Sequence, residues 1–154
     1  LAATCKFFLG SGGGICDLAR CVCHATTMFQ NLIPLSPRVW KWLTDDTVFI
    51  PKLLWSRDFD RYMSFAEINE SGAAEYWSTR EYEQNGIEVH DNTADDSLML
   101  TEEVFLRKAG SWSQSADGEL RQSEFKKLIA RYCSHELASF RIGDAFLRKH
   151  EFLL

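Results

Sequence analysis

The fold of this chain is predicted from the stretch Ser113-Gln114-Ser115-Ala116-Asp117-Gly118-Glu119-Leu120-Arg121-Gln122-Ser123-Glu124, which Phe125 follows. An Asp-Gly pair favours a sharp turn, because glycine adopts left-handed backbone conformations at little cost. From Phe125 onward, apolar residues recur at Leu128, Ile129 and Tyr132, the spacing of one face of a helix. The stretch therefore predicts a polar loop that leads into an amphipathic helix.

A second stretch can be aligned with the first, position by position. It is Ser56-Arg57-Asp58-Phe59-Asp60-Arg61-Tyr62-Met63-Ser64-Phe65-Ala66-Glu67, followed by Ile68. Both stretches have serine at position 1, aspartate at position 5 and glutamate at position 12. The residue before position 1 is Trp55 in one and Trp112 in the other. Agreement at these equivalent places indicates two related helix–loop–helix units.

Both stretches resemble the twelve-residue calcium loop of the EF-hand family. That loop takes oxygen ligands from positions 1, 3, 5, 7, 9 and 12, turns at a glycine in position 6 and ends on a glutamate. The resemblance covers roughly residues 45–135 and implies an all-α fold. It assigns metal-ligand roles to Ser56, Asp58, Asp60, Tyr62, Ser64 and Glu67 in the first loop, and to Ser113, Ser115, Asp117, Glu119 and Glu124 in the second.

Both loops depart from the family pattern in ways that weaken the metal site. Serine replaces the usual carboxylate at position 1 in each, and Arg61 occupies the glycine position of the first loop. A non-glycine residue held in a left-handed conformation costs about 1–2 kcal/mol. Arg121, at position 9 of the second loop, adds a positive charge. We therefore expect Ca²⁺ binding to be weak or lost, and no other cofactor.

Two regions are expected along the chain. Residues 1–37 form an irregular N-terminal arm, and residues 38–154 form the EF-hand-like helical domain, with an acidic linker near 87–97. Asn85-Gly86 predicts the end of a helix. The alternative architecture is a helical bundle with acidic, capped turns.

Composition and charge limit the classes of partner. The 154 residues are 45% hydrophobic, which is typical of a folded domain, and their formal net charge is −5. Residues 45–100 carry thirteen acidic against four basic residues, which argues against nucleic acid as a partner. Residues 1–44 carry four basic residues against one acidic. The arm, residues 1–37, is therefore expected to be a docking or membrane-surface segment, and an arm packed on its own domain is an equal alternative. The sequence does not name the compartment; an intracellular one is expected, which includes an organellar or membrane-associated site.

Other groupings of residues carry weaker signals. Cys16, Cys21, Cys23 and His24 have irregular spacing for structural zinc, and a second pair would have to come from Cys133 and His135. The run 10–14 is not a phosphate loop, because it lacks the terminal Gly-Lys-Ser/Thr. The aromatic residues Trp40, Trp42, Phe49 and Trp55 are expected in the core, and the alternative is an aromatic-rich groove that holds a partner helix.

The functional prediction is a non-catalytic accessory or interaction subunit, bound to other protein subunits in a larger assembly. The alternative is a calcium-responsive sensor that exposes a groove when it binds the ion. The serines at both first positions and Arg61 favour the accessory subunit. No enzyme activity is predicted.

Overall fold

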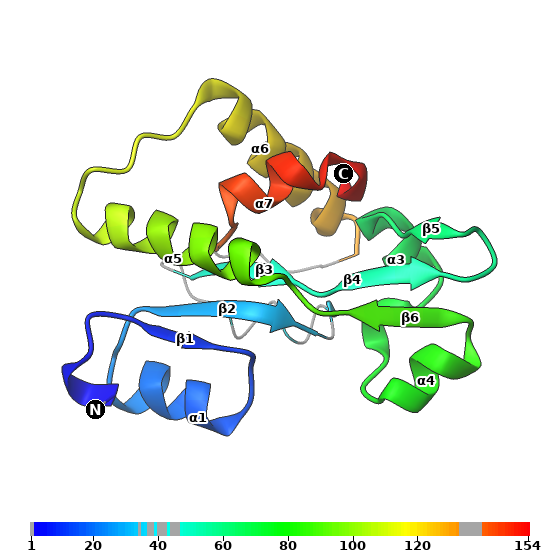
Figure 1. Cartoon of the computed structure of the whole chain (residues 1–154), viewed down its shortest axis with the longest axis horizontal. Coiled ribbons are helices and arrows are strands. Elements are labelled where there is room, and N and C mark those ends of the chain that lie inside the picture. Colours follow the sequence, from blue (N-terminus) through cyan, green and yellow to red (C-terminus); the bar gives the residue numbers. More distant parts are fainter. Residues whose placement is uncertain (1, 34, 37–38, 40–42, 44–46, 133–139) are drawn as a thin grey trace.

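The computed structural model of the chain describes residues 2–33, 35–36, 39, 43, 47–132 and 140–154. Its architecture is mixed α/β, with a four-stranded parallel sheet, a three-stranded antiparallel sheet and helices packed around them (Figure 1). The predicted all-α fold class is therefore wrong, and so is the alternative of a helical bundle. None of the described helices is long and apolar enough to cross a membrane.

The parallel sheet has the strand order β1-β2-β3-β7. Its strands are β1 (Phe8–Gly10), β2 (Thr27–Leu32), β3 (Val48–Pro51) and β7 (Arg141–Ile142). All neighbouring pairs run in the same direction, so their carboxyl ends share one edge of the sheet. Strand β3 is fully buried and β2 is mostly buried, as expected for parallel strands that are covered on both faces.

The predicted irregular arm, residues 1–37, is part of this sheet rather than a separate tail. After β1, the chain forms a short helical segment made of α1 (Gly14–Asp17) and η2 (Leu18–Val22), and then returns as β2 beside β1. The arm therefore supplies a compact strand–helix–strand unit at one edge of the domain.

The glycines of this unit have two structural roles. Gly12 and Gly13 have φ angles of 92° and 90°, which residues with a Cβ atom rarely adopt. A Cβ on Gly10 would collide with the sulfur of buried Cys16. Close packing of α1 on β1 thus requires glycine at that position.

The antiparallel sheet has the order β5-β4-β6. Its strands are β4 (Leu53–Ser56), β5 (Arg61–Tyr62) and β6 (Ile87–His90). Only Lys52 separates β4 from β3, so one extended segment passes from the parallel sheet into the antiparallel one. This shared segment sets the two sheets side by side (Figure 1).

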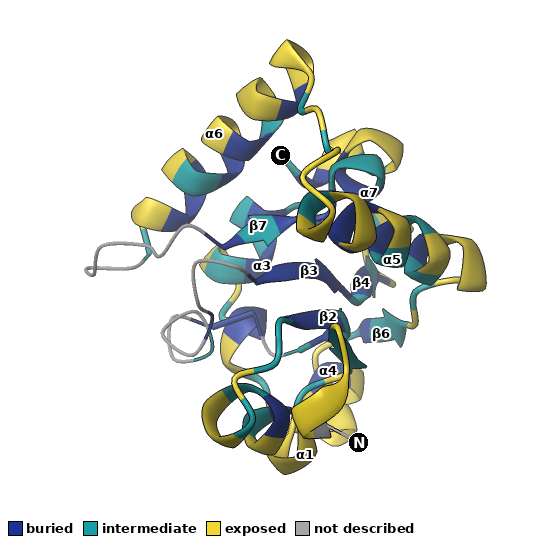
Figure 2. Cartoon of the chain, turned by 90° about the vertical axis from the view of Figure 1, so that its left-hand side faces the viewer, coloured by how far each residue is buried: buried dark blue, intermediate teal, exposed yellow. Residues whose placement is uncertain are grey.

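Helices cover both faces of the parallel sheet. Helices α5 (Ala94–Lys108), α6 (Ala116–Ala130) and α7 (Asp144–Lys149) lie on one side, and α1 lies on the other (Figure 2). The shorter elements are η1 (Ala2–Thr4), α3 (Phe65–Glu70), η3 (Ala73–Glu75), α4 (Thr79–Gln84) and η4 (Glu151–Leu153). Helix α4 ends before Asn85, as the sequence predicted.

The core is centred on phenylalanine rings from different elements. Phe125 on α6 lies 5.2 Å from Phe65 on α3 and 6.3 Å from Phe49 on β3, measured between ring centroids. All three rings are fully buried. The predicted apolar face of the second helix is confirmed, because Leu128 and Ile129 are buried with Phe125. Trp40 and Trp42, predicted to join the core, lie outside the described residues.

The first predicted calcium loop, residues 56–67, is a β-hairpin followed by a helix. Strand β4 ends at Ser56, a turn occupies residues 57–60, and β5 pairs back onto β4. Trp55 and Tyr62 face each other across the hairpin, with ring centroids 5.0 Å apart. Pairing of aromatic residues across neighbouring strands stabilises a sheet, and here it replaces the incoming helix that an EF-hand requires.

The second predicted loop, residues 113–124, becomes helical after three residues. The hydroxyl of Ser115 accepts a hydrogen bond from the backbone N–H of Gly118 at 3.0 Å and caps α6. Gly118 therefore lies in the first helical turn, not at a sharp loop turn. The predicted acidic linker 87–97 comprises β6 and the start of α5, which Thr93 caps.

A pair of asparagines joins the end of the parallel sheet to the segment between β6 and α5. The backbone N–H groups of Asn31 and Asn92 each donate to the other's side-chain oxygen, at 2.6 Å. The Asn92 side-chain amide also donates to the carbonyl of Pro51 at 2.7 Å. These bonds hold the ends of β2 and β3 against the strand that leads out of the second sheet.

We expect Asn92→Ala to lower the free energy of unfolding by about 2 kcal/mol, because two partly buried backbone groups lose their partners. Urea unfolding followed by circular dichroism measures the change. The matched control is Asn85→Ala, which removes one exposed hydrogen bond to the Glu81 carbonyl and should cost less than about 1 kcal/mol. Equal losses in the two variants would contradict a special role for Asn92.

Candidate functional site

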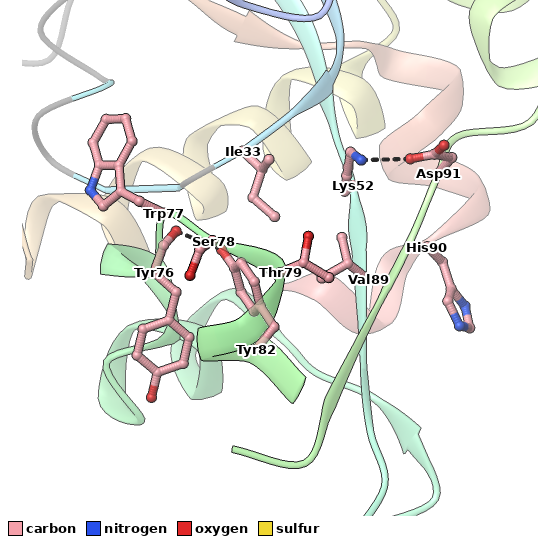
Figure 3. A pocket seen from close by; sticks show the side chains of 10 residues that line it. All are labelled: Ile33, Lys52, Tyr76, Trp77, Ser78, Thr79, Tyr82, Val89, His90 and Asp91. Atoms are coloured by element: carbon pink, nitrogen blue, oxygen red, sulfur yellow. Dashed lines mark hydrogen bonds and ion pairs between the residues drawn. The ribbon is translucent and has the colours of Figure 1, made fainter. Parts of the chain in front are cut away.

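A pocket of about 570 Å³ lies where β2 and β3 end (Figure 3). Ile33 follows β2 directly, and Lys52 follows β3. The opposite wall is the segment 76–82, which runs from the end of η3 into the first turns of α4. Val89 and His90 at the end of β6, and Asp91 just after it, complete the lining. Ligands of open parallel α/β sheets bind outside the carboxyl ends of the strands, which is where this pocket lies.

The aromatic wall is held rigidly by α4. Ser78 and Glu81 form a reciprocal capping box at the start of this helix. The hydrogen bond from the Ser78 hydroxyl is the largest effect that lowers the pKa of Glu81. Tyr82 is buried, its hydroxyl donates to the carbonyl of Tyr76 at 3.1 Å, and burial raises its pKa. Trp77, between these anchored residues, is 63% exposed.

The polar wall is an ion pair. The ammonium group of Lys52 lies 2.7 Å from the carboxylate of Asp91, and the Lys52 side chain is the more buried of the two. In Figure 3 this pair and Trp77 lie on opposite sides of the pocket, with Ile33 and Thr79 between them. The pair brings a donor and an acceptor to the pocket without adding net charge.

His90 is oriented away from this centre. Its Nδ1 lies 3.0 Å from the Tyr62 hydroxyl, and its Nε2 lies 3.5 Å from a carboxylate oxygen of Glu88. Its ring is stacked on Trp55, with centroids 6.4 Å apart. In Figure 3 the imidazole points away from Lys52 and the aromatic wall. The His90 ring therefore packs on the antiparallel sheet beside the pocket and does not point into it.

Two polar groups of the lining have no partner within the part of the chain that the structure describes. These are the hydroxyl of Thr79 and the indole N–H of Trp77. A bound molecule could therefore form hydrogen bonds here without breaking one within the protein. Among the described residues, no group of three His, Cys, Asp or Glu side chains is arranged to hold a metal ion.

The structure uses the predicted ligands of the first loop in other ways. Ser64 and Glu67 form the capping box of α3, and Arg61 forms an ion pair with Glu67. Asp58 and Asp60 lie in the exposed hairpin turn. The positive φ angle, 50°, falls on Asp60 and not on the predicted turn residue Arg61.

The remaining two predicted ligands of this loop belong to the second sheet. Tyr62 bonds to His90 through its hydroxyl, and the hydroxyl of Ser56 accepts from the backbone N–H of Phe59 at 3.4 Å. Of the six predicted ligands, the structure brings Ser64 and Glu67 into direct contact through the capping box.

The predicted ligands of the second loop are spread along α6. Ser113 lies before the helix and Ser115 caps it. Asp117 and Glu124 are seven residues apart on the helix, a rise of about 10 Å. Glu119 forms an ion pair with Arg141 at 2.7 Å. The helix thus keeps apart the carboxylates that the prediction placed around one calcium ion. Calcium binding remains a prediction, but neither stretch has the loop structure on which it was based.

Among the described residues, Cys16, Cys21 and Cys23 of the arm are free thiols. Cys5 and Cys21 are exposed, Cys16 is buried and Cys23 is intermediate. Cys133 and His135, which a zinc site would have needed, lie outside the described residues.

The pocket residues were missed in the sequence because their signals are local. The pattern Ser78-x-x-Glu81 indicates a capping box and therefore a helix start. The same pattern occurs at Ser64-x-x-Glu67 and Thr93-x-x-Asp96, where the structure also has capping boxes. These signals locate helices, but no sequence signal places residues 33, 52, 76–82 and 89–91 around one cavity.

The carboxyl group of Glu67 is expected to titrate near pH 2. Two hydrogen bonds from Arg61 and one from the Ser64 backbone hold its pKa at about 2, below the usual 4.5. Because the pKa is lowered in the folded state, this interaction stabilises the fold above about pH 4.5 and is lost as pH falls through about 2.

Carbon-detected NMR of the side-chain carboxyl group measures this pKa. Arg61→Gln should raise it toward the usual value, whereas Arg57→Gln, which removes a neighbouring ion pair to Glu88, should leave it unchanged. A pKa near 4.5 in the unaltered protein would contradict the geometry.

We compared the chain with protein-family models, with curated proteins and with solved structures, and none of the three comparisons found a match. The function is therefore argued from the geometry of the pocket.

Proposed function

We propose that this chain is a non-catalytic binding domain for a small polar molecule that contains a planar ring. The observation that carries this proposal is the 570 Å³ pocket at the carboxyl ends of β2 and β3, with an aromatic wall facing an ion pair. Its volume falls within the roughly 300–1,000 Å³ of pockets that bind small molecules.

The aromatic wall favours a planar ring. Trp77 is held beside a capped helix start, yet most of its side chain is open to solvent. Exposing an indole ring to water is unfavourable, and stacking a ligand ring on it contributes about 0.5–1.5 kcal/mol beyond the burial of area. Ile33 and Val89 add apolar surface between the walls.

The polar groups favour a ligand with both donors and acceptors and little net charge. Lys52 and Asp91 neutralise each other, so the lining does not select strongly for an anion or a cation. Asp91 has 69% of its side chain exposed, so a ligand can reach it without breaking a buried contact. The Thr79 hydroxyl supplies a further hydrogen-bonding group between the walls.

Binding of the matched pair phenol and cyclohexanol tests this proposal, since the two differ mainly in planarity. Benzamide and indole are additional planar probes. Saturation-transfer NMR should detect the planar probes with dissociation constants of about 1 mM, as expected for fragments of this size, and cyclohexanol more weakly.

Variants locate the binding. Trp77→Ala should weaken the binding of the planar probes by about three- to tenfold through loss of stacking. Phe59→Ala is the matched control, because Phe59 is also an exposed aromatic residue but lies in the β4–β5 turn and does not line the pocket. The proposal fails if no planar probe gives saturable binding, or if the control weakens binding as much as Trp77→Ala.

The predicted role of accessory or interaction subunit is kept as a second candidate function. The residues that the structure describes form no EF-hand-like scaffold, but one surface supports this role. Ile15, Leu18 and Val22 are 61%, 45% and 67% exposed and lie at i, i+3 and i+7 of the helical segment after β1. An exposed apolar face of this kind is typical of a surface that another protein covers. Absence of probe binding at the pocket would favour this second candidate.

A further inference from the structure

We infer that a second pocket, at the opposite edge of the parallel sheet, binds a small phosphate-type anion such as orthophosphate or pyrophosphate. This inference is independent of the ligand proposed above. The pocket has a volume of about 320 Å³ and lies where β2, β3 and β7 begin. Thr26 and Thr47 precede β2 and β3, Arg141 opens β7, and Arg107 and Lys108 end α5.

The charged residues that line this pocket are all basic. Arg107, Lys108 and Arg141 line it together with two threonines and two valines, and no acidic side chain does. Arg107 and Lys108 alone would be an ordinary feature, because cations are favourable at a helix carboxyl end. Arg141 comes from a different element and converges on the same cavity, which a helix-end effect does not explain.

Arg107 is held in place before any anion binds. Arg107 donates from Nε to buried Glu103 at 2.9 Å and from Nη2 to Gln114 at 2.8 Å, and its guanidinium lies 4.9 Å from the ring centroid of Trp112. Preorganisation of this kind lowers the entropy lost when a ligand binds.

Arg141 retains unused hydrogen-bonding capacity. Its Nη2 donates to Glu119 at 2.7 Å, but its Nε is buried and has no hydrogen-bond partner in the described parts of the chain. A buried donor without an acceptor is unfavourable, and an anion oxygen in the pocket would satisfy it. Glu119 is 55% exposed, and exposed ion pairs contribute little, so an anion can compete for the same guanidinium.

The remaining groups fit a compact oxyanion. A planar guanidinium can bind two oxygens of one phosphate group, and an ammonium adds a point charge. No described residue forms an ion pair or a hydrogen bond with the Lys108 side chain, which is therefore available. Thr26 contributes a hydroxyl donor. The 320 Å³ volume is at the lower end of the range for ligand pockets, which favours a small anion over a larger organic molecule.

Isothermal titration of the full chain with sodium pyrophosphate and with orthophosphate tests the inference, in dilute buffer at pH 7. Sodium chloride at matched ionic strength is the blank. We expect saturable binding of pyrophosphate with a dissociation constant below about 1 mM, and weaker binding of orthophosphate, which carries less charge. Amide NMR shifts should be confined to the strand starts near Thr26 and Thr47 and to the end of α5.

Three variants decide between a built site and a general charge effect. Lys108→Gln should weaken pyrophosphate binding by about three- to tenfold, and Arg141→Gln by about tenfold or more, because each removes a charge-assisted hydrogen bond. Lys127→Gln, an exposed position on α6 that removes the same charge, should change the affinity less than about twofold.

Two results would overturn the inference. One is the absence of saturable binding of pyrophosphate up to about 10 mM, a dissociation constant weaker than any specific site of this kind would give. The other is an equal loss of affinity in Lys108→Gln and Lys127→Gln. If Arg141→Gln does not fold, as judged by circular dichroism, the exposed Lys108 variant decides the question by itself.

Discussion

Both sheets depend on one extended segment, residues 48–56, in which β3 and β4 are separated only by Lys52. Its first part pairs in parallel with β2 and β7, and its second part pairs antiparallel with β5 and β6. Because a single stretch of backbone belongs to both sheets, neither sheet can shift without moving the other. Lys52 lies where this segment passes from the parallel sheet to the antiparallel sheet. This position places it in the lining of the pocket, opposite the aromatic wall that packs against β6.

The sequence predicted helix surfaces better than it predicted the fold. The spacing of Phe125, Leu128 and Ile129 correctly indicated a buried helix face, because helical periodicity is a local property. The wrong prediction concerned the residues that precede the helix, which were interpreted as a calcium loop. An N-cap and a calcium loop both require oxygen-bearing side chains next to a helix, so Ser115 and Glu67 satisfy either pattern. In the structure these oxygens accept hydrogen bonds from backbone N–H groups and from Arg61.

The parallel sheet was missed for a different physical reason. Its strands are short, and buried parallel strands lack the alternation of apolar and polar residues that identifies a half-exposed strand. Its pairings are also distant in sequence, as shown by Val48 opposite Arg141. Burial of the run 48–51 is understandable after the fact, but a short apolar run is equally compatible with a buried helix segment. The pocket is equally difficult to predict from the sequence, since its walls come from four segments that are far apart in the chain.

The placement of charge shows why a site cannot be inferred from net charge alone. The chain has a formal charge of −5, yet the pocket at the strand starts is lined by three basic side chains. At physiological salt, charges more than about 8 Å apart are largely screened. An anion inside the pocket therefore interacts mainly with Arg107, Lys108 and Arg141, and the carboxylates of Glu103 and Glu119, which pair with the two arginines, offset part of this positive charge. Local geometry, not overall composition, then determines the sign of the ligand, and the two edges of one sheet can favour ligands of different charge.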